Sequence, residues 1–312
     1  MAGLAGERSD GEQGEKKGDS VLHGRCLFWV GMLVIDCHAH IYSPDERRYP
    51  PRAEPMRPPA GKGSVEDLRH ESLANGVHCV RAVHTVSFYD YDNRYLADVA
   101  KRADPWLAGV CTLDPDQPHA PDTLRQLLRE FNVKTLRSIP SRREDTFDSA
   151  GVRALWTICR EEGATIDIFL MQPKMIESAS KLLAEFDSVT VGFCHCMDLK
   201  VGPDLEENTA LVCGMARFPN LIAKVDFIST GTQMGYPSSD LHDAARQVIR
   251  AFGPDRCVWG SNYPNAVWTP KLSYSEHLKI FQQALRLSDE EKRWILGETA
   301  RRAWFPHIEP EA

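Results

Sequence analysis

The chain has 312 residues, of which 42% are hydrophobic and 26% charged, as in an ordinary globular protein. That composition excludes a disordered chain, and the lack of any run of about 18 uncharged apolar residues argues against a membrane span. The formal net charge of −7 argues against a nucleic-acid partner, because such affinity depends mostly on Lys and Arg neutralising phosphates.

Residues 1–31 are predicted to be a disordered segment or an extension ahead of the folded unit. Residues 1–20 are rich in Gly, Glu, Lys, Asp and Ser, which predicts disorder. The stretch after them is more apolar, as in a signal peptide, but His23 and Arg25 interrupt it and no A-x-A cleavage site follows. The nine cysteines include no CxxC pair and lie mostly in apolar runs, which favours a reducing compartment. We therefore expect a cytoplasmic chain.

From residue 32 onward, short β-branched or apolar runs alternate with polar stretches of helical spacing. The expected strands are 32–36, 79–84, 106–112, 133–137, 165–170, 190–195, 221–226 and 257–261. The expected helices are 64–75, 93–103, 121–131, 150–162, 173–186, 205–217, 239–252 and 274–285, with a terminal helix at 289–304. Eight strands that alternate with helices predict an α/β fold, a (β/α)₈ TIM barrel, over 32–312. An open doubly wound sheet is disfavoured because no Gly-rich dinucleotide loop follows the first strand.

Local signals support several of these boundaries. Ser64 is placed as a helix N-cap, Pro121 falls in a first turn, and Gly253 follows the end of a helix. The loop 42–63 holds six prolines and is too long for a simple connection. In a barrel we expect it to lie over the active face.

His38 and His40 are the first candidates for chemistry. They lie two residues apart at the C-terminal end of the first strand, so both side chains point to one face. Active sites of TIM barrels form at that end of the strands. Such a pair can bind a metal or polarise a substrate oxygen.

His195 and Asn262 are the next candidates. His195 ends the sixth predicted strand, and the alternation of a strand would turn Cys194 and Cys196 away from the barrel mouth. Asn262 follows the eighth strand, where it can orient a substrate or donate a hydrogen bond but cannot act as a base.

Charged and polar residues on other strands complete the predicted site. Arg137 closes the fourth strand, where an arginine in a barrel mouth favours a substrate carboxylate. His84 ends the second strand and Lys224 lies in the seventh, so each is a candidate for substrate binding. Asp167 and Asp226 also lie in strands, as a base of raised pKa or as partners of Lys or Arg.

Several segments resemble a known family. The segments IDCHAH, AGVCTLDPD, NVKTLRSIP, VGFCHCMD, NLIAKVDF, VWGSNYP and ILGETARRAWF occur in the family's order. Over about 32–306 the chain resembles the amidohydrolase-related proteins of the 2-pyrone-4,6-dicarboxylate lactonase and sugar-lactonase type. The resemblance implies an amidohydrolase TIM barrel that hydrolyses a lactone. A sister group decarboxylates aromatic or muconate-like acids with one zinc.

The resemblance also implies roles for individual residues. His38 and His40 match the first-strand pair, and His195 matches the histidine that polarises the substrate carbonyl. Arg137 matches an arginine that often holds a substrate carboxylate. Asn262 stands where the family usually has the Asp that activates water. The water-activating base is therefore unassigned, with Asp226, Asp198 or a first-strand histidine as candidates.

A second departure concerns the metal. Zinc-dependent members have a His on the fifth strand, where this chain reads DIFLMQP with Met171 and Gln172. Gln and Asn are poor zinc ligands, so the resemblance favours the lactonase type, which often works without a cofactor. The alternative is one divalent metal, zinc, bound through His38, His40 and His195.

The expected function is hydrolysis of a small carboxylated lactone or related cyclic ester. The runner-up is a metal-dependent decarboxylase, and a third interpretation is a barrel that binds a ligand without turning it over. The expected partner is a small anionic substrate, with no nucleic acid and no membrane. A homo-oligomer is left open.

Overall fold

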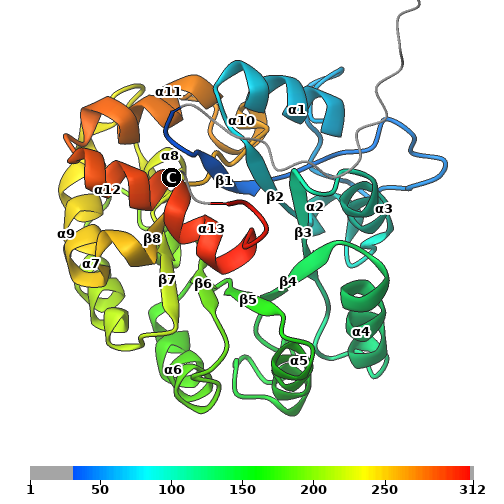
Figure 1. The fold of residues 1–312 in the computed structure, drawn as a ribbon. Helices are drawn as coiled ribbons and strands as arrows, with labels where there is room; N and C mark the ends of the chain where they lie inside the picture. The colour runs from blue at the N-terminus through cyan, green and yellow to red at the C-terminus, as the bar shows by residue number, and fades with distance from the viewer. Residues whose placement is uncertain (1–30, 310–312) are drawn as a thin grey trace, which may run out of the picture.

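The computed structural model describes residues 31–309, so the predicted extension lies outside the described residues apart from Gly31. Eight parallel strands follow one another around a single sheet in chain order (Figure 1). They are β1 (Ile35–Ala39), β2 (Cys79–Val83), β3 (Leu107–Thr112), β4 (Val133–Ser138), β5 (Thr165–Ile168), β6 (Val191–Phe193), β7 (Leu221–Lys224) and β8 (Cys257–Val258). The predicted (β/α)₈ barrel is confirmed.

Helices surround this barrel. The outer layer contains α1 (Val65–Ala74), α3 (Arg94–Arg102), α4 (Ala120–Glu130), α5 (Ala150–Glu161), α6 (Ile176–Glu185), α7 (Leu205–Gly214), α9 (His242–Phe252) and α11 (Tyr274–Lys279). The chain ends with α12 (Asp289–Arg293) and α13 (Thr299–Trp304). No helix within residues 31–309 is long and apolar enough to cross a membrane.

Short helical segments at the C-terminal ends of strands were not predicted. They are α2 (Val86–Tyr89), the turn Cys194–Asp198, α8 (Phe227–Gly231) and α10 (Asn265–Trp268). Segments of four or five residues are too short to show a helical period in the sequence. The fifth to eighth strands are shorter than predicted, and after the sixth, seventh and eighth the chain leaves the sheet early to build three of these segments.

Hydrogen bonds between β1 and the segment after β8 close the barrel. The Asn262 amide donates to the His38 carbonyl at 2.8 Å, and the His40 amide donates to the Tyr263 carbonyl at 2.7 Å. Gly260 permits this approach, because a Cβ there would lie 2.7 Å from the Cβ of His38. The first-strand histidines are thus fixed against the loop that carries Asn262.

The predicted boundary signals are confirmed, whereas the long loop lies beside the active face and none of its residues lines the central cavity. Ser64 accepts a hydrogen bond from the Asp67 amide at 3.0 Å, and Asp67 accepts one from the Ser64 amide, which is a capping box. Within the loop 42–63, the Arg52 amide donates to the carbonyl of Phe88 in α2 at 2.8 Å. The loop therefore packs beside the C-terminal mouth of the barrel.

At the other end of the barrel, α13 lies across the N-terminal ends of the strands (Figure 1). Trp304 and Phe305 pack in one apolar cluster with Ile35 and Ala108 from the strand starts. The Arg81 guanidinium lies 3.7 Å from the centre of the Trp304 ring, a cation–π contact. This end is therefore closed by packing.

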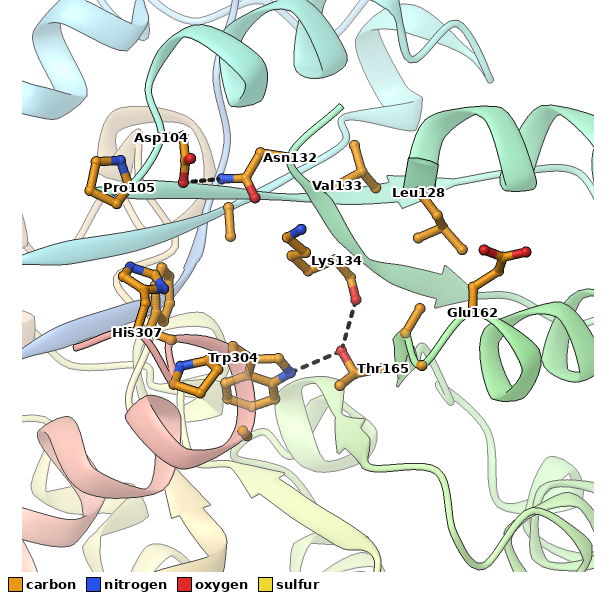
Figure 2. A pocket seen from close by; sticks show the side chains of 16 residues that line it. Asp104, Pro105, Leu128, Asn132, Val133, Lys134, Glu162, Thr165, Trp304 and His307 are labelled. Carbon is orange, nitrogen blue, oxygen red and sulfur yellow. Dashed lines mark hydrogen bonds between the residues drawn. The ribbon is translucent and has the colours of Figure 1, made fainter. Parts of the chain in front are cut away.

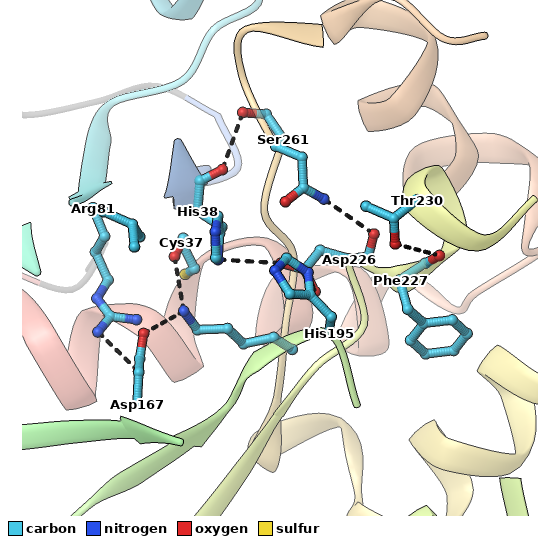
Figure 3. Close-up of polar contacts among 12 residues, drawn as sticks. Cys37, His38, Arg81, Asp167, His195, Asp226, Phe227, Thr230 and Ser261 are labelled. Carbon is cyan, nitrogen blue, oxygen red and sulfur yellow. Dashed lines mark hydrogen bonds and ion pairs between the residues drawn. The ribbon is translucent and has the colours of Figure 1, made fainter. Parts of the chain in front are cut away.

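A fully buried ionic cluster fills the middle of the barrel. Lys224 Nζ lies 2.5 Å from one Asp167 oxygen and Arg81 lies 3.1 Å from the other (Figure 3). Lys224 also donates to the Cys37 carbonyl at 3.3 Å. Burial raises the pKa of Asp167, but Arg81 and Lys224 outweigh it and hold the pKa below its ordinary value. Gly192 leaves room for this cluster, because a Cβ there would overlap the Asp167 carboxylate.

Candidate active site

A cavity of about 460 Å³ opens at the C-terminal end of the barrel, among the loops that follow the strands. Its lining residues come from seven strand ends and the segments after them: His40, Thr85, Val86, Ser87, Arg137, Phe169, Met171, His195, Asp198, Thr230, Asn262 and Trp268. Four of the predicted site residues therefore meet in one cavity. This is the end of the barrel where TIM-barrel enzymes react.

A larger cavity of about 650 Å³ lies at the N-terminal end and is a poor candidate for chemistry. Figure 2 shows that several polar groups there bond to one another. Asn132 donates to Asp104 at 3.1 Å, and the Trp304 indole donates to Thr165 at 3.0 Å. Paired groups at this end of a barrel indicate a structural role.

His38 and His40 face each other, although the first strand was predicted three residues too early and His40 lies just past Ala39, where β1 ends. Their Nε2 atoms are 3.3 Å apart, and both side chains are buried. His40 Nδ1 lies 2.8 Å from the Val83 carbonyl, which only accepts, so His40 Nδ1 carries the proton and Nε2 is a free acceptor. Two Nε2 lone pairs at this distance would repel each other, so a proton or a cation must lie between the two nitrogens.

His195 reaches the cavity by a different route from the one predicted. β6 ends at Phe193, and residues 195–198 have φ values of 52°, 43°, 63° and 54°. The alternation argument for Cys194 and Cys196 is therefore wrong, because these residues are not in a strand; Cys196 donates to the Lys224 carbonyl at 3.3 Å. Four successive left-handed residues are costly and persist only where the surroundings fix them, often at functional sites.

Asp226, which follows β7, lies between His38 of β1 and His195 of the turn after β6 (Figure 3). Its Oδ1 lies 3.2 Å from His195 Nδ1, and its Oδ2 lies 3.6 Å from His38 Nδ1. All four atoms are buried, and none has a hydrogen-bond partner of good geometry among residues 31–309. Buried polar atoms without partners indicate a missing ion, proton or water.

These atoms fit a divalent metal. His38, His195 and Asp226 each offer a donor atom, and the donors lie within 4.8 Å of one another. Ligands about 2.0–2.1 Å from a tetrahedral zinc lie about 3.3 Å apart, close to the spacings observed. The predicted metal group had His40 in place of Asp226; His40 lies against the other nitrogen of His38. Burial lowers the pKa of His38 and of His40 well below the ordinary value, which favours the neutral form that binds metals.

Arg137 brings an uncompensated positive charge to the cavity. Its side chain is held by Thr112, which accepts from Nε at 3.1 Å, and by the His84 carbonyl, which accepts from Nη2 at 2.8 Å. It is 8% exposed, and no carboxylate in residues 31–309 lies within ion-pair distance of it. Burial lowers its pKa, so an anion in the cavity would stabilise it.

The remaining predicted residues divide into two groups. Asn262 lines the cavity, and its amide donates to the Asp226 carbonyl at 3.2 Å and to Ser229 at 3.0 Å. His84 and Lys224 are not among the cavity-lining residues. His84 Nε2 lies 2.7 Å from the Asp90 carbonyl, and burial lowers the pKa of His84 to about 4. Lys224 belongs to the ionic cluster with Asp167 in the middle of the barrel. Their contact with substrate stays a prediction.

The sequence did not indicate that Asp226 joins two of the histidines. Its position at the end of a predicted strand was the available signal, and that signal placed it only among candidate bases. Trp268, whose ring lies 5.1 Å from the His40 ring, was not predicted at all. It belongs to one of the short helices that carry no periodic pattern.

Comparisons with known proteins agree with the fold. A protein from Pseudomonas putida, proposed to be a 2-pyrone-4,6-dicarboxylic acid hydrolase, is 21% identical with a TM-score of 0.72, covering 90% of this chain and 100% of its own. A probable hydrolase of the same acid from Acinetobacter baumannii, with citric acid bound, is 16% identical with a TM-score of 0.68, covering 88% and 99%.

A Burkholderia multivorans amidohydrolase with bound zinc is 19% identical with a TM-score of 0.66, covering 87% of this chain and 99% of its own. Among curated proteins, none matches the sequence. The sequence profile of the amidohydrolase family matches residues 35–305, which is nearly the whole barrel. The chain therefore belongs to the amidohydrolase family.

Proposed function

We propose that the chain hydrolyses a small carboxylated lactone or related cyclic ester. The observation that carries the proposal is the single cavity that joins an unpaired, buried Arg137 to the imidazoles of His40 and His195. A guanidinium binds a carboxylate in bidentate geometry, so Arg137 would fix the acid group of the substrate. The similar proteins proposed as hydrolases of 2-pyrone-4,6-dicarboxylic acid support a cyclic ester that carries carboxylates.

Asp198 is the best-placed general base for this reaction. Of the described residues that line the cavity, it alone carries a carboxylate, whereas the Asp226 oxygens are buried. Thr230 Oγ1 lies 3.4 Å from an Asp198 oxygen and lines the same cavity. Asp198 would take a proton from water as the water oxygen bonds to the carbonyl carbon. It would return that proton to the ring oxygen as the carbon–oxygen ring bond breaks.

The substrate carbonyl would lie against His40 and His195. His38, His195 and Asp226 would hold a metal ion, which as a Lewis acid would polarise the carbonyl oxygen. Asp226 also fixes the imidazoles, because its two oxygens face His38 and His195 from below the cavity. Trp268 covers His40 with an apolar ring, which limits water on that side.

The donor group also favours the second candidate, a metal-dependent decarboxylase. That reaction releases carbon dioxide and places a proton on carbon instead of opening an ester. The two reactions differ in their products: hydrolysis of a lactone releases one proton and no gas. A barrel that only binds ligands would give neither.

The test uses purified protein and 5-oxotetrahydrofuran-3-carboxylate, a lactone with one carboxylate, with proton release and carbon dioxide both measured. We expect proton release, and Arg137→Met should raise KM by about 10–100-fold with little change in kcat, because a charge-assisted hydrogen bond is lost. Arg129→Met, which removes an exposed surface arginine, is the matched control. Carbon dioxide release, or binding without turnover of any carboxylated lactone, would overturn the proposal.

A further inference from the structure

A second cavity of about 310 Å³ adjoins the central cavity. It lies between the segments that follow β2, β4 and β5. Four residues line both cavities, namely Val86, Arg137, Phe169 and Met171. A ligand bound by Arg137 would therefore lie next to both the central and the second cavity.

The two cavities differ in chemistry. The imidazoles and the carboxylate lie in the central cavity, whereas Ile139, Phe147 and Met175 give the second cavity apolar walls. The polar side chains that line only the second cavity are Tyr91, Arg142 and Gln172; Arg142 and Gln172 are exposed, and the Tyr91 hydroxyl is buried. Mostly apolar walls with a few polar groups are typical of a pocket for an uncharged substituent.

Arg137 is held at the boundary between these cavities. Its bonds to Thr112 and to the His84 carbonyl leave it little freedom, and its guanidinium lies 5.3 Å from the centre of the Phe169 ring. A carboxylate bound there would place the reacting ester toward His195. The substituent next to the carboxylate would then point into the apolar space.

We propose that the second cavity binds an apolar alkyl or aryl group of the substrate, attached beside the carboxylate that Arg137 holds. The substrate class is thus a lactone acid with an apolar substituent, and this inference rests on the proposed function. The thioethers of Met171 and Met175 suit such a group, because methionine side chains adapt to apolar ligands of different shape.

The experiment measures kcat/KM for 5-oxotetrahydrofuran-3-carboxylates that carry hydrogen, methyl, propyl or phenyl at carbon 2. Each buried methylene should raise kcat/KM about 4-fold, and the propyl compound should exceed the unsubstituted one by about 60-fold. A flat or falling series, with the unsubstituted lactone still hydrolysed, would overturn the inference and leave the proposed function intact.

Two variants test whether the second cavity causes the effect. Ile139→Trp and Gln172→Trp each add bulk to it, and neither residue lines the central cavity. Each should lower kcat/KM for the propyl lactone by about 10-fold or more and leave the unsubstituted lactone within about 2-fold. Gln172 is exposed, so this variant should fold even if Ile139→Trp does not. Lys174→Trp places the same side chain at an exposed position outside the cavity and is the matched control.

Binding of acids that cannot be hydrolysed tests the assignment of the second cavity independently of the proposed lactone hydrolysis. Cyclopentanecarboxylates with hydrogen, methyl or propyl at carbon 2 keep the carboxylate and the substituent but lack the ester. If no lactone is turned over, yet the dissociation constant of these acids falls with substituent length and Gln172→Trp removes that trend, the proposed function fails and the second cavity stands. Equal dissociation constants across the series would overturn the cavity assignment.

Discussion

Two groups of charged side chains are stacked inside the same barrel, and they differ in whether the oxygens of their carboxylate have hydrogen-bond partners. In the lower group, Asp167 lies between Arg81 and Lys224, and each of its oxygens contacts a cation. In the upper group, Asp226 faces two imidazoles whose nearest nitrogens have no hydrogen bond. Both groups are buried, and β7 serves both, because Lys224 is its last residue and Asp226 lies two residues further on.

The difference shows which charges serve the fold and which serve chemistry. A closed ionic cluster offers nothing to a ligand, so its residues contribute to stability or folding specificity. Atoms without partners cost free energy in a buried place and are retained where a ligand, proton or ion satisfies them. Lys224 is paired with Asp167 inside the barrel, whereas Arg137 lines the cavity and has no carboxylate partner among residues 31–309.

The largest effect is expected at the general base. Asp198→Asn should lower kcat on a carboxylated lactone by about 10²–10⁴-fold, because the amide cannot accept the proton of water. The free energy of unfolding should change by less than about 1 kcal/mol, since the side chain is only partly buried. Steady-state kinetics and urea unfolding check both statements. A kcat within about 3-fold of the wild type would remove Asp198 from the mechanism.

The next effect belongs to the lower group. Asp167→Asn leaves two buried cations without a counter-charge and should lower the free energy of unfolding by about 3–5 kcal/mol. Urea unfolding measures the loss. Glu161→Gln, which breaks the exposed pair with Arg125, is the control and should cost less than about 1 kcal/mol. Equal costs for the two variants would contradict the distinction between the groups.

A third test concerns His277, a fully buried histidine outside both groups. Burial lowers its pKa from 6.5 to about 4 in the folded chain. Below pH 6.5 the imidazole of His277 is protonated in the unfolded chain but stays neutral in the folded chain. This histidine therefore destabilises the fold as pH falls toward 4. His277→Phe should therefore gain stability relative to the wild type, by up to about 3 kcal/mol, between pH 7 and pH 4. Unfolding curves at several pH values measure it, and a constant difference would disprove the assignment.

The smallest effect is expected at Asn262. Asn262→Asp removes the amide donor to the Asp226 carbonyl and to Ser229, and it places a negative charge beside that carbonyl oxygen. We expect the free energy of unfolding to fall, or the activation barrier of the native reaction to rise, by about 1–3 kcal/mol. Thermal unfolding and kcat measure the two effects. A faster native reaction would show instead that this position still serves water activation.

The sequence by itself determined the fold class and part of the site. Eight apolar runs alternating with helical stretches are a local pattern, and each run needs only its neighbours to form a strand. The placement of His38 and His40 on one face follows from the period of a strand, and Arg137 follows from its place at a strand end. These inferences use positions close together in the chain.

Only the tertiary structure decided how the charges are paired. Asp226 lies close to His38, which is 188 residues earlier in the chain. No local pattern in either segment indicates this contact. Lys224 and His84 stand at strand ends much as Arg137 does, yet they contact Asp167 and the Asp90 carbonyl. Their roles depend on which side chains face one another across the barrel, and that is set by register and by short turns that leave no periodic signal.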